Sequence, residues 1–438
     1  MIGSILVFAR AVRRRLSDVT GRLPVLAIRD FRLLLADRVL APAAFAFSLV
    51  GVSFAVLNET GGSTSALSYV LAAQIAPSVV FVLLGGVIAD RIAPQRVIVA
   101  GNAMIALGEG AFGILVLAGH PALWLMIALE CVTGTGMALF YPASTALLPR
   151  IVPSDSMQQA SAVSRLAMNA AQMGGAVLAG FCVAAVGAGW ALTVCGVGML
   201  GTLPLMLALR VGPADRSGQD ASMLRDLREG WSEFRSRQWI WVTTLQYAVV
   251  MMSWYGAFTV LGPAVARAHL GGPAAWGAIT GAESLGLIAG GMASLRFTVG
   301  RPIRFVVLSG AGIAVAPLAL AMLWPLPLIC VEAFVLGIVM EIMMVQWTVT
   351  LATNVPPAIL ARVSSYDALG VVLAMPAGAL IAGPLAAWIS VSRTQYGAAA
   401  LIVVASALAF IPRTVRQFRN GQAIEPTETT ESVLVGSA

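Results

Sequence analysis

The chain has 438 residues, of which 59% are apolar and only 11% are charged, and its formal net charge is +7. A water-soluble chain of this length would expose far more charge, so the composition excludes an ordinary soluble domain and indicates a protein that crosses a membrane several times. The 27 basic residues are all Arg. They gather in gaps between apolar segments, which favours contact with anionic membrane lipids over a nucleic-acid partner.

Apolar segments long enough to cross a bilayer recur along the chain, each with about 20 residues. They lie at residues 39–58, 65–88, 97–119, 122–143, 159–187, 190–210, 239–266, 273–295, 303–323, 325–350, 364–389 and 393–412. We therefore predict an all-α integral membrane protein with twelve transmembrane helices.

The longest polar stretch, residues 211–238, divides these spans six and six. Within it, Leu224, Leu227, Trp231 and Phe234 recur at helical spacing, which predicts an amphipathic helix on the membrane surface; a solvated linker is the alternative. The predicted units are a basic N-terminal segment (1–38), a first six-helix bundle (39–210), the linker (211–238), a second six-helix bundle (239–412) and a tail (413–438).

The Arg residues predict the orientation of the chain. All but two, Arg267 and Arg393, fall before the first span, after the last, or around alternate gaps between spans. Because cytoplasmic loops carry the excess of positive charge, we expect both termini in the cytoplasm and a multi-pass protein of the cell membrane.

Residues of the first half recur in the second half at a nearly constant distance, which indicates two bundles of like topology. Gly86, Arg91 and Arg96 recur 205 positions later as Gly291, Arg296 and Arg301; Gly134, Pro153, Gly175 and Gly180 recur 203 positions later as Gly337, Pro356, Gly378 and Gly383. We assign the six glycines of the second set to helix packing. In transporters such repeats place the substrate site between the halves, near the middle of the membrane.

The loop after the second span carries a recognisable motif. Residues 85–96 read GGVIADRIAPQR and resemble the G-x-x-x-D-R-x-G-R-R signature of the major facilitator superfamily. The matching residues are Gly86, Asp90, Arg91 and Arg96, whereas residues 93–95 depart. The resemblance implies a gating contact in which Asp90 pairs with an Arg or a helix N-terminus of the other half; a purely structural charged turn is the alternative.

Four further stretches, at residues 30–34, 54–57, 141–149 and 362–365, resemble the branch of this superfamily that exports drugs, macrolides and enterobactin. The resemblance covers residues 29–412. It implies a secondary active transporter that exports hydrophobic or amphiphilic small molecules by alternating access, in exchange for protons. Two departures bear on the protons: Gly174–Gly180 lacks the family's Pro, and Phe45 stands where many relatives carry an acid. An importer of the same fold, or a sensor or scaffold without transport, are the alternatives.

Acidic residues inside spans are expensive and therefore candidates for proton or substrate binding. The resemblance implies that spans 1, 4, 7 and 10 line the central cavity, which favours Glu130 and Glu341 over Glu109 and Glu283. For Glu130 and Glu341 a structural, hydrogen-bonded role is an equal alternative. For Glu109, Glu283, Glu332 and Asp367 it is the favoured one.

Large apolar residues suggest a wall for lipophilic ligands, formed by Trp254, Tyr255, Phe258, Met344 and Trp347; simple packing is the alternative. His, Cys and paired carboxylates do not gather at one predicted depth, so we expect no enzyme, metal site or cofactor. ATP-driven pumping is excluded because a phosphate-binding loop needs Lys, which the chain lacks. We expect a monomer with a small-molecule substrate, protons and membrane lipids as partners.

Overall fold

The computed structural model describes residues 24–91, 93–119, 121–209, 223–294, 296 and 299–418. In this part of the chain most residues are helical and none forms a strand. A helix pairs its backbone polar groups within itself, which hydrocarbon requires of a spanning segment. The predicted all-α fold class is confirmed.

The first half of the chain supplies six long helices. They are α2 (Arg29–Glu59), α3 (Thr64–Arg91), α4 (Pro94–Ala118), α5 (Leu123–Ile151), α6 (Met157–Val186) and α7 (Ala188–Leu207), with the short 3-10 turns η1 (Pro24–Ala27) before α2 and η2 (Ser154–Ser156) before α6.

The second half repeats this design with more interruptions. Its spans are α9 (Gln238–Trp254) with η3 (Tyr255–Val260), α10 (Gly262–Val265) and η4 (Ala266–Leu270); α11 (Pro273–Ser294); α12 (Pro302–Gly312) with α13 (Val315–Ala321); α14 (Leu326–Asn354); α15 (Pro357–Ile389); and α16 (Val391–Ala409), followed by α17 (Arg413–Gln417). Both η3 and η4 are π-helical turns, a widening of the helix that is frequent at functional sites.

Ten helical segments in the described residues are long and apolar enough to cross a membrane. The described apolar part of α3, at Thr64–Val80, and α11, with 22 residues, occupy the places of the other two predicted spans. The structure is therefore consistent with the predicted twelve.

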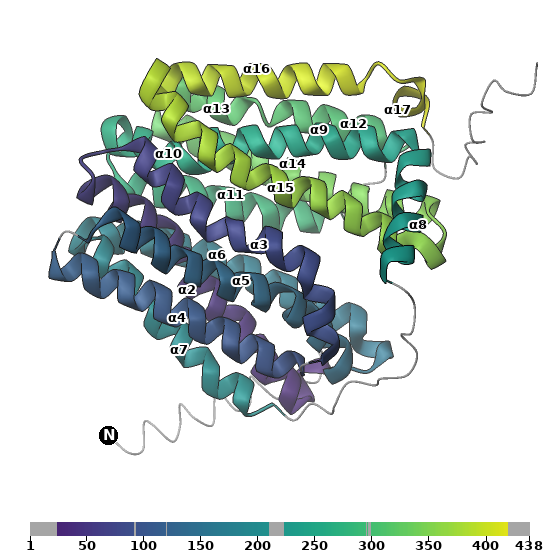
Figure 1. Ribbon diagram of the computed structural model, residues 1–438, viewed down its shortest axis with the longest axis horizontal. Coiled ribbons are helices and arrows are strands. Elements are labelled where there is room, and N and C mark those ends of the chain that lie inside the picture. Colours follow the sequence, from purple (N-terminus) through teal and green to yellow (C-terminus); the bar gives the residue numbers. More distant parts are fainter. Residues whose placement is uncertain are drawn as a thin grey trace, which may run out of the picture.

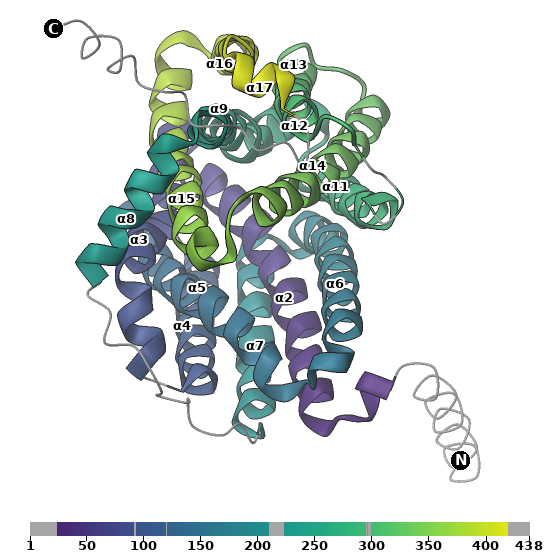
Figure 2. The same cartoon turned by 90° about the vertical axis from the view of Figure 1, so that its right-hand side faces the viewer.

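The two halves form two bundles that lie one above the other (Figures 1 and 2). In Figure 1 the upper bundle holds α9 to α16 and the lower one holds α2 to α7. Helix α8 (Met223–Ser236) lies at the right of this view, where the chain passes from one bundle to the other. We call this the linker end of the molecule and the opposite end the far end.

Equivalent turns at the far end show the relation between the halves. Gly187 alone joins α6 to α7 with φ at 96°, and Ser390, 203 positions later, joins α15 to α16 with φ at 107°. This region of φ suits glycine and strains other residues. The Ser390 hydroxyl accepts a hydrogen bond from the Arg393 backbone N–H at 3.3 Å, which helps to hold the strained turn.

Helix α8 packs on the start of α15. The Trp231 ring lies 5.8 Å from Phe234 and 5.4 Å from Tyr366, centroid to centroid. Phe234 is buried while Trp231 is half exposed, as expected of a helix with one apolar face on the protein. Residues 211–222, and the side chains of Leu224 and Leu227, lie outside the described part of the chain, so the predicted unit boundaries stay a prediction.

Candidate transport site

Two carboxyl groups meet in the middle of the first bundle. Glu109 on α4 and Glu130 on α5 are both fully buried, and Glu109 lies close enough for its charge to act on Glu130. The prediction that paired carboxylates do not gather at one depth is therefore wrong. Because α4 and α5 run antiparallel, Glu109 near the end of one helix reaches the depth of Glu130 near the start of the next.

Neutral side chains hold this pair. The Ser48 hydroxyl on α2 donates to Glu109 Oε1 at 2.5 Å, and the Gln74 amide on α3 donates to Glu130 Oε2 at 2.7 Å. The second oxygens, Glu109 Oε2 and Glu130 Oε1, are buried and accept no hydrogen bond from any residue that the structure describes. Neither carboxyl contacts a cationic side chain among the described residues. Unpaired carboxyl oxygens away from water cost free energy. Their presence indicates that the site has a function besides helix packing.

Gly134 brings Gln74 to this pair. A methyl group at Gly134 would lie 1.9 Å from the Gln74 carbonyl oxygen, so only glycine permits α3 and α5 to approach this closely. Glu130 lies one turn before Gly134 on α5. The same close approach therefore sets the position of Gln74 and its hydrogen bond to Glu130.

The second bundle makes the corresponding contact with different chemistry. A methyl group at Gly337 on α14 would lie 2.2 Å from the Glu283 carbonyl oxygen on α11. Glu283 and Glu332 are both partly buried, and Glu332 lies close enough for its charge to act on Glu283. An acid thus stands in the second half where the first half has the amide of Gln74.

A second pair of packing glycines, Gly175 and Gly378, also makes equivalent contacts in the two halves. A methyl group at Gly175 would lie 2.6 Å from the Ala43 carbonyl oxygen, and one at Gly378 would lie 2.1 Å from that of Met252. Each of these contacts joins the first and fifth spans of its own bundle. The repeated glycines therefore correspond to repeated helix contacts.

The last glycine pair joins one bundle to the other at the far end. A methyl group at Gly180 on α6 would lie 2.8 Å from the Pro273 carbonyl oxygen on α11. Gly383 on α15 packs on α3, where its backbone N–H donates to Ser68 Oγ at 2.7 Å and its carbonyl accepts from Thr64 Oγ1 at 3.1 Å. The far end of the molecule is therefore closed between the bundles.

Toward the linker end, an ion pair joins the two bundles. Arg165 Nη1 on α6 lies 3.0 Å from Glu341 Oε1 on α14. The Arg165 side chain is 69% exposed and that of Glu341 is 15% exposed. Glu341 is thus matched by a cation of the opposite half and does not join the Glu109–Glu130 pair.

The gating motif is described only in part. The surroundings of Gly86 and the side chains of Asp90 and Arg91 lie outside the described part of the structure, and Arg96 is exposed. Two of the departures from the motif have structural roles. Pro94 begins α4, where its missing N–H is not needed, and the Gln95 amide donates to the carbonyls of Met206 and Leu209 at 2.6 and 3.1 Å.

The five predicted wall residues separate into two groups. Trp254 stacks on Phe258 at 5.6 Å, and Phe258 packs on Trp276 at 5.2 Å, as a buried aromatic cluster. Tyr255, beside them, is buried and feels the charge of Glu130 across the interface between the bundles. Met344 and Trp347 instead line a separate pocket.

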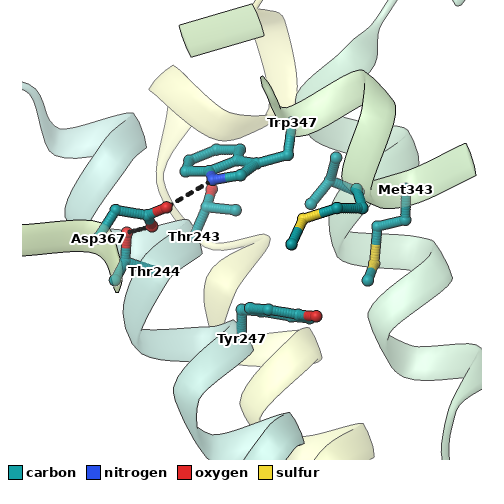
Figure 3. A pocket seen from close by; sticks show the side chains of 8 residues that line it. Thr243, Thr244, Tyr247, Met343, Trp347 and Asp367 are labelled. Carbon is teal, nitrogen blue, oxygen red and sulfur yellow. Dashed lines mark hydrogen bonds between the residues drawn. The ribbon is translucent and has the colours of Figure 1, made fainter. Parts of the chain in front are cut away.

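Pockets lie in both bundles. The one in the first bundle has a free volume of about 120 Å³ and is apolar except for one amide; its lining is Ala41, Pro42, Phe45, Ile105, Met137, Phe140, Met168, Gln172 and Met199. The one in the second bundle is narrower, about 10 Å³, and contains a carboxylate; its lining is Thr243, Thr244, Tyr247, Val306, Met343, Met344, Trp347 and Asp367 (Figure 3). Phe45, aligned with an acid of relatives, thus lines an apolar pocket.

Comparison with known proteins identifies the family of the chain. The model of the Major Facilitator Superfamily matches residues 39–366. The chain belongs to the major facilitator superfamily. It is therefore a multi-pass membrane transporter and not an enzyme.

Other members of the superfamily resemble the chain in sequence and in structure. The enterobactin exporter EntS of Escherichia coli O1:K1 is 25% identical over 349 residues, which cover 77% of this chain and 81% of EntS. An inward-facing, unoccupied bacterial homolog of the human lysosomal transporter Spinster matches with a TM-score of 0.68 at 16% identity, over 90% of this chain and 99% of the homolog. The nucleoside transporter NupG matches with a TM-score of 0.71 at 10% identity, over 87% of this chain and 99% of NupG. The likeness in structure shows the facilitator fold.

Proposed function

We propose that this facilitator exports hydrophobic or amphiphilic small molecules from the cytoplasm, with protons moving in the opposite direction. The sequence likeness to an enterobactin exporter supports the direction, and the mostly apolar pocket of the first bundle supports the substrate class. The Arg residues support a cytoplasmic linker end and a cell-membrane location. With the far end closed, the molecule is then in a state that loads its substrate from the cytoplasm.

The observation that carries the proton proposal is the buried Glu109–Glu130 pair. Two carboxylates this close, with neutral partners only, would repel each other in a site without water. We therefore expect at least one of them to hold a proton while the site is enclosed. Opening of the bundles to the opposite side would admit water and change that preference. Each proton that crosses the membrane inward supplies about 2.3 kcal/mol per 100 mV.

The other predicted acids take lesser parts in this proposal. Glu341 already has a cation, Arg165, and contributes to the contact between the bundles. Glu283 lies with Glu332 in the second bundle, and both remain partly buried. Asp90 stays a predicted gating residue, because its side chain lies outside the described part of the chain.

The proposal is tested with the full chain in proteoliposomes that contain a pH-sensitive dye. Enterobactin and ethidium serve as substrates, and the readout is proton movement that depends on substrate. We expect Glu130→Gln to abolish this movement and to leave substrate binding intact, and Glu109→Gln to reduce it by about tenfold or more, as for loss of one proton-transferring group. Glu332→Gln is the matched control, a partly buried acid outside the pair, and should retain the parent's flux.

Three outcomes would overturn parts of the proposal. Parent-like pH dependence in Glu130→Gln would dismiss the pair as the proton site. Higher, saturable accumulation of substrate in cells that express the chain would identify an importer. Absence of substrate-dependent flux for every compound tested would favour a sensor or scaffold.

A further inference from the structure

The pocket of the second bundle has an anionic rim that the proton proposal does not use. Asp367, on α15, accepts a hydrogen bond from Thr244 Oγ1 at 2.6 Å and one from Trp347 Nε1 at 2.8 Å. These donors come from α9 and α14, so one carboxylate connects three helices. We call this site the Asp367 pocket, with the lining given above.

The carboxylate of Asp367 has neutral partners only. No cationic side chain pairs with it among the residues that the structure describes. Each carboxylate oxygen has two lone-pair positions, and the hydroxyl and the indole each occupy one. The rim can therefore accept further hydrogen bonds, and no side chain in the described structure balances a negative charge on it.

Aromatic and sulfur-containing side chains form the walls beside this charge. In Figure 3 the rings of Trp347 and Tyr247 face each other across the space, with Met343 at one side and Asp367 near its edge. Ring faces attract cations, Trp most strongly, and Met adapts its shape to apolar ligands. A carboxylate beside two ring faces is an arrangement that suits a flat organic cation.

The size and exposure of the pocket limit what can enter it. Its free volume is about 10 Å³, room for about one water molecule, so a head group of one or two rings enters only when the side chains that line the pocket move apart. Met344, which lines it, is 47% exposed, and its flexible side chain can move aside. The mostly apolar pocket of the first bundle offers no counter-charge.

We propose that the Asp367 pocket binds the flat, cationic head group of the transported molecule, which makes amphiphilic organic cations the substrate class. This inference rests on the proposed export function. The charge of the ligand meets Asp367, its ring lies between Trp347 and Tyr247, and its apolar remainder stays outside this pocket.

The test compares two probes of the same shape, the permanently charged 1-methylquinolinium and the neutral 1-methylnaphthalene. Binding to the purified full chain in nanodiscs is measured by fluorescence titration. We expect the cation to bind about tenfold more tightly than the neutral probe, and Asp367→Asn to weaken cation binding by about tenfold with the neutral probe unchanged. Glu332→Gln, an acid of the same bundle outside the pocket, should bind the cation as the parent does.

A second pair of variants covers the case in which Asp367→Asn fails to fold. Trp347→Phe keeps a ring but loses the indole N–H, and should retain cation binding within about threefold. Trp347→Leu removes the ring and should weaken it by about tenfold. Equal binding of both probes by the parent, or parent-like cation binding in a folded Asp367→Asn or Trp347→Leu protein, would overturn the inference.

Failure of the two proposals can be told apart. Cation binding that depends on Asp367, without transport of any amphiphile in proteoliposomes, refutes export and supports the pocket. Normal export of ethidium by Asp367→Asn refutes the pocket as the head-group site and leaves export standing.

Discussion

Gly383→Ala should shift the transporter away from the state that is closed at the far end. The added methyl group would lie 2.1 Å from the Thr64 carbonyl oxygen and 2.2 Å from the Ser68 hydroxyl. The hydroxyls of Thr64 and Ser68 already form hydrogen bonds with the Gly383 backbone and hold α3 close to α15, so the two helices must separate to admit the methyl group. Overpacking of this kind costs about 1–3 kcal/mol, which lowers the ratio of closed to open molecules about 5- to 150-fold at 1.4 kcal/mol per tenfold.

Distances between spin labels at the far end measure this shift. The labels replace Val186 and Trp388, which are 57% and 83% exposed and lie on different bundles, in a background without the native cysteines. Gly174→Ala is the matched control, because nothing lies within 4 Å of the methyl group it adds. We expect a larger population of long label-to-label distances than in the parent for Gly383→Ala, and no such change for Gly174→Ala.

A folded Gly383→Ala protein with the distance distribution of its parent would show that this contact does not hold the far end closed. An equal shift in the Gly174→Ala control would show that the effect follows from the loss of glycine and not from the clash. A shift in Gly383→Ala alone ties the closed state to this one contact between the bundles.

Three other substitutions test separate contacts. Gly134→Ala should lower the free energy of unfolding by about 1–3 kcal/mol, because its methyl group meets the Gln74 backbone; thermal unfolding equal to that of the parent would contradict the close approach. Arg165→Gln removes an exposed ion pair with Glu341 and should change stability by less than about 1 kcal/mol, so a large drop in melting temperature would show that this pair holds the bundles together. Asp90→Asn should impair efflux with normal membrane yield, and efflux at the parent's rate would remove its gating role.

The acids show where sequence reasoning reached the site and where it stopped. Hydropathy places Glu109 and Glu130 inside spans, and antiparallel neighbours at equal depth are a signal that could have found the pair. No such signal exists for Ser48 and Gln74, whose types occur throughout membrane helices. For Asp367 the sequence favours a structural role, because its position near the start of a span does not predict which side chains of other helices face it.

The sequence by itself determined the helical class, the spans, the family and the repeat of its halves. Hydrocarbon forces each crossing segment to pair its own backbone groups, so length and apolarity suffice to predict it. The glycine spacing is similarly local, because a helix needs a small residue wherever another backbone comes near.

Only the tertiary structure decided which polar groups meet. Glu341 faces Arg165, 176 residues away, and Asp367 accepts from Thr244, 123 residues away. Such partners depend on the rotation and tilt of each helix, which many side-chain contacts set together. The closed far end has the same origin: glycines permit the close approach of the helices, and the contacts of α3 with α15 and of α6 with α11 hold the bundles together there.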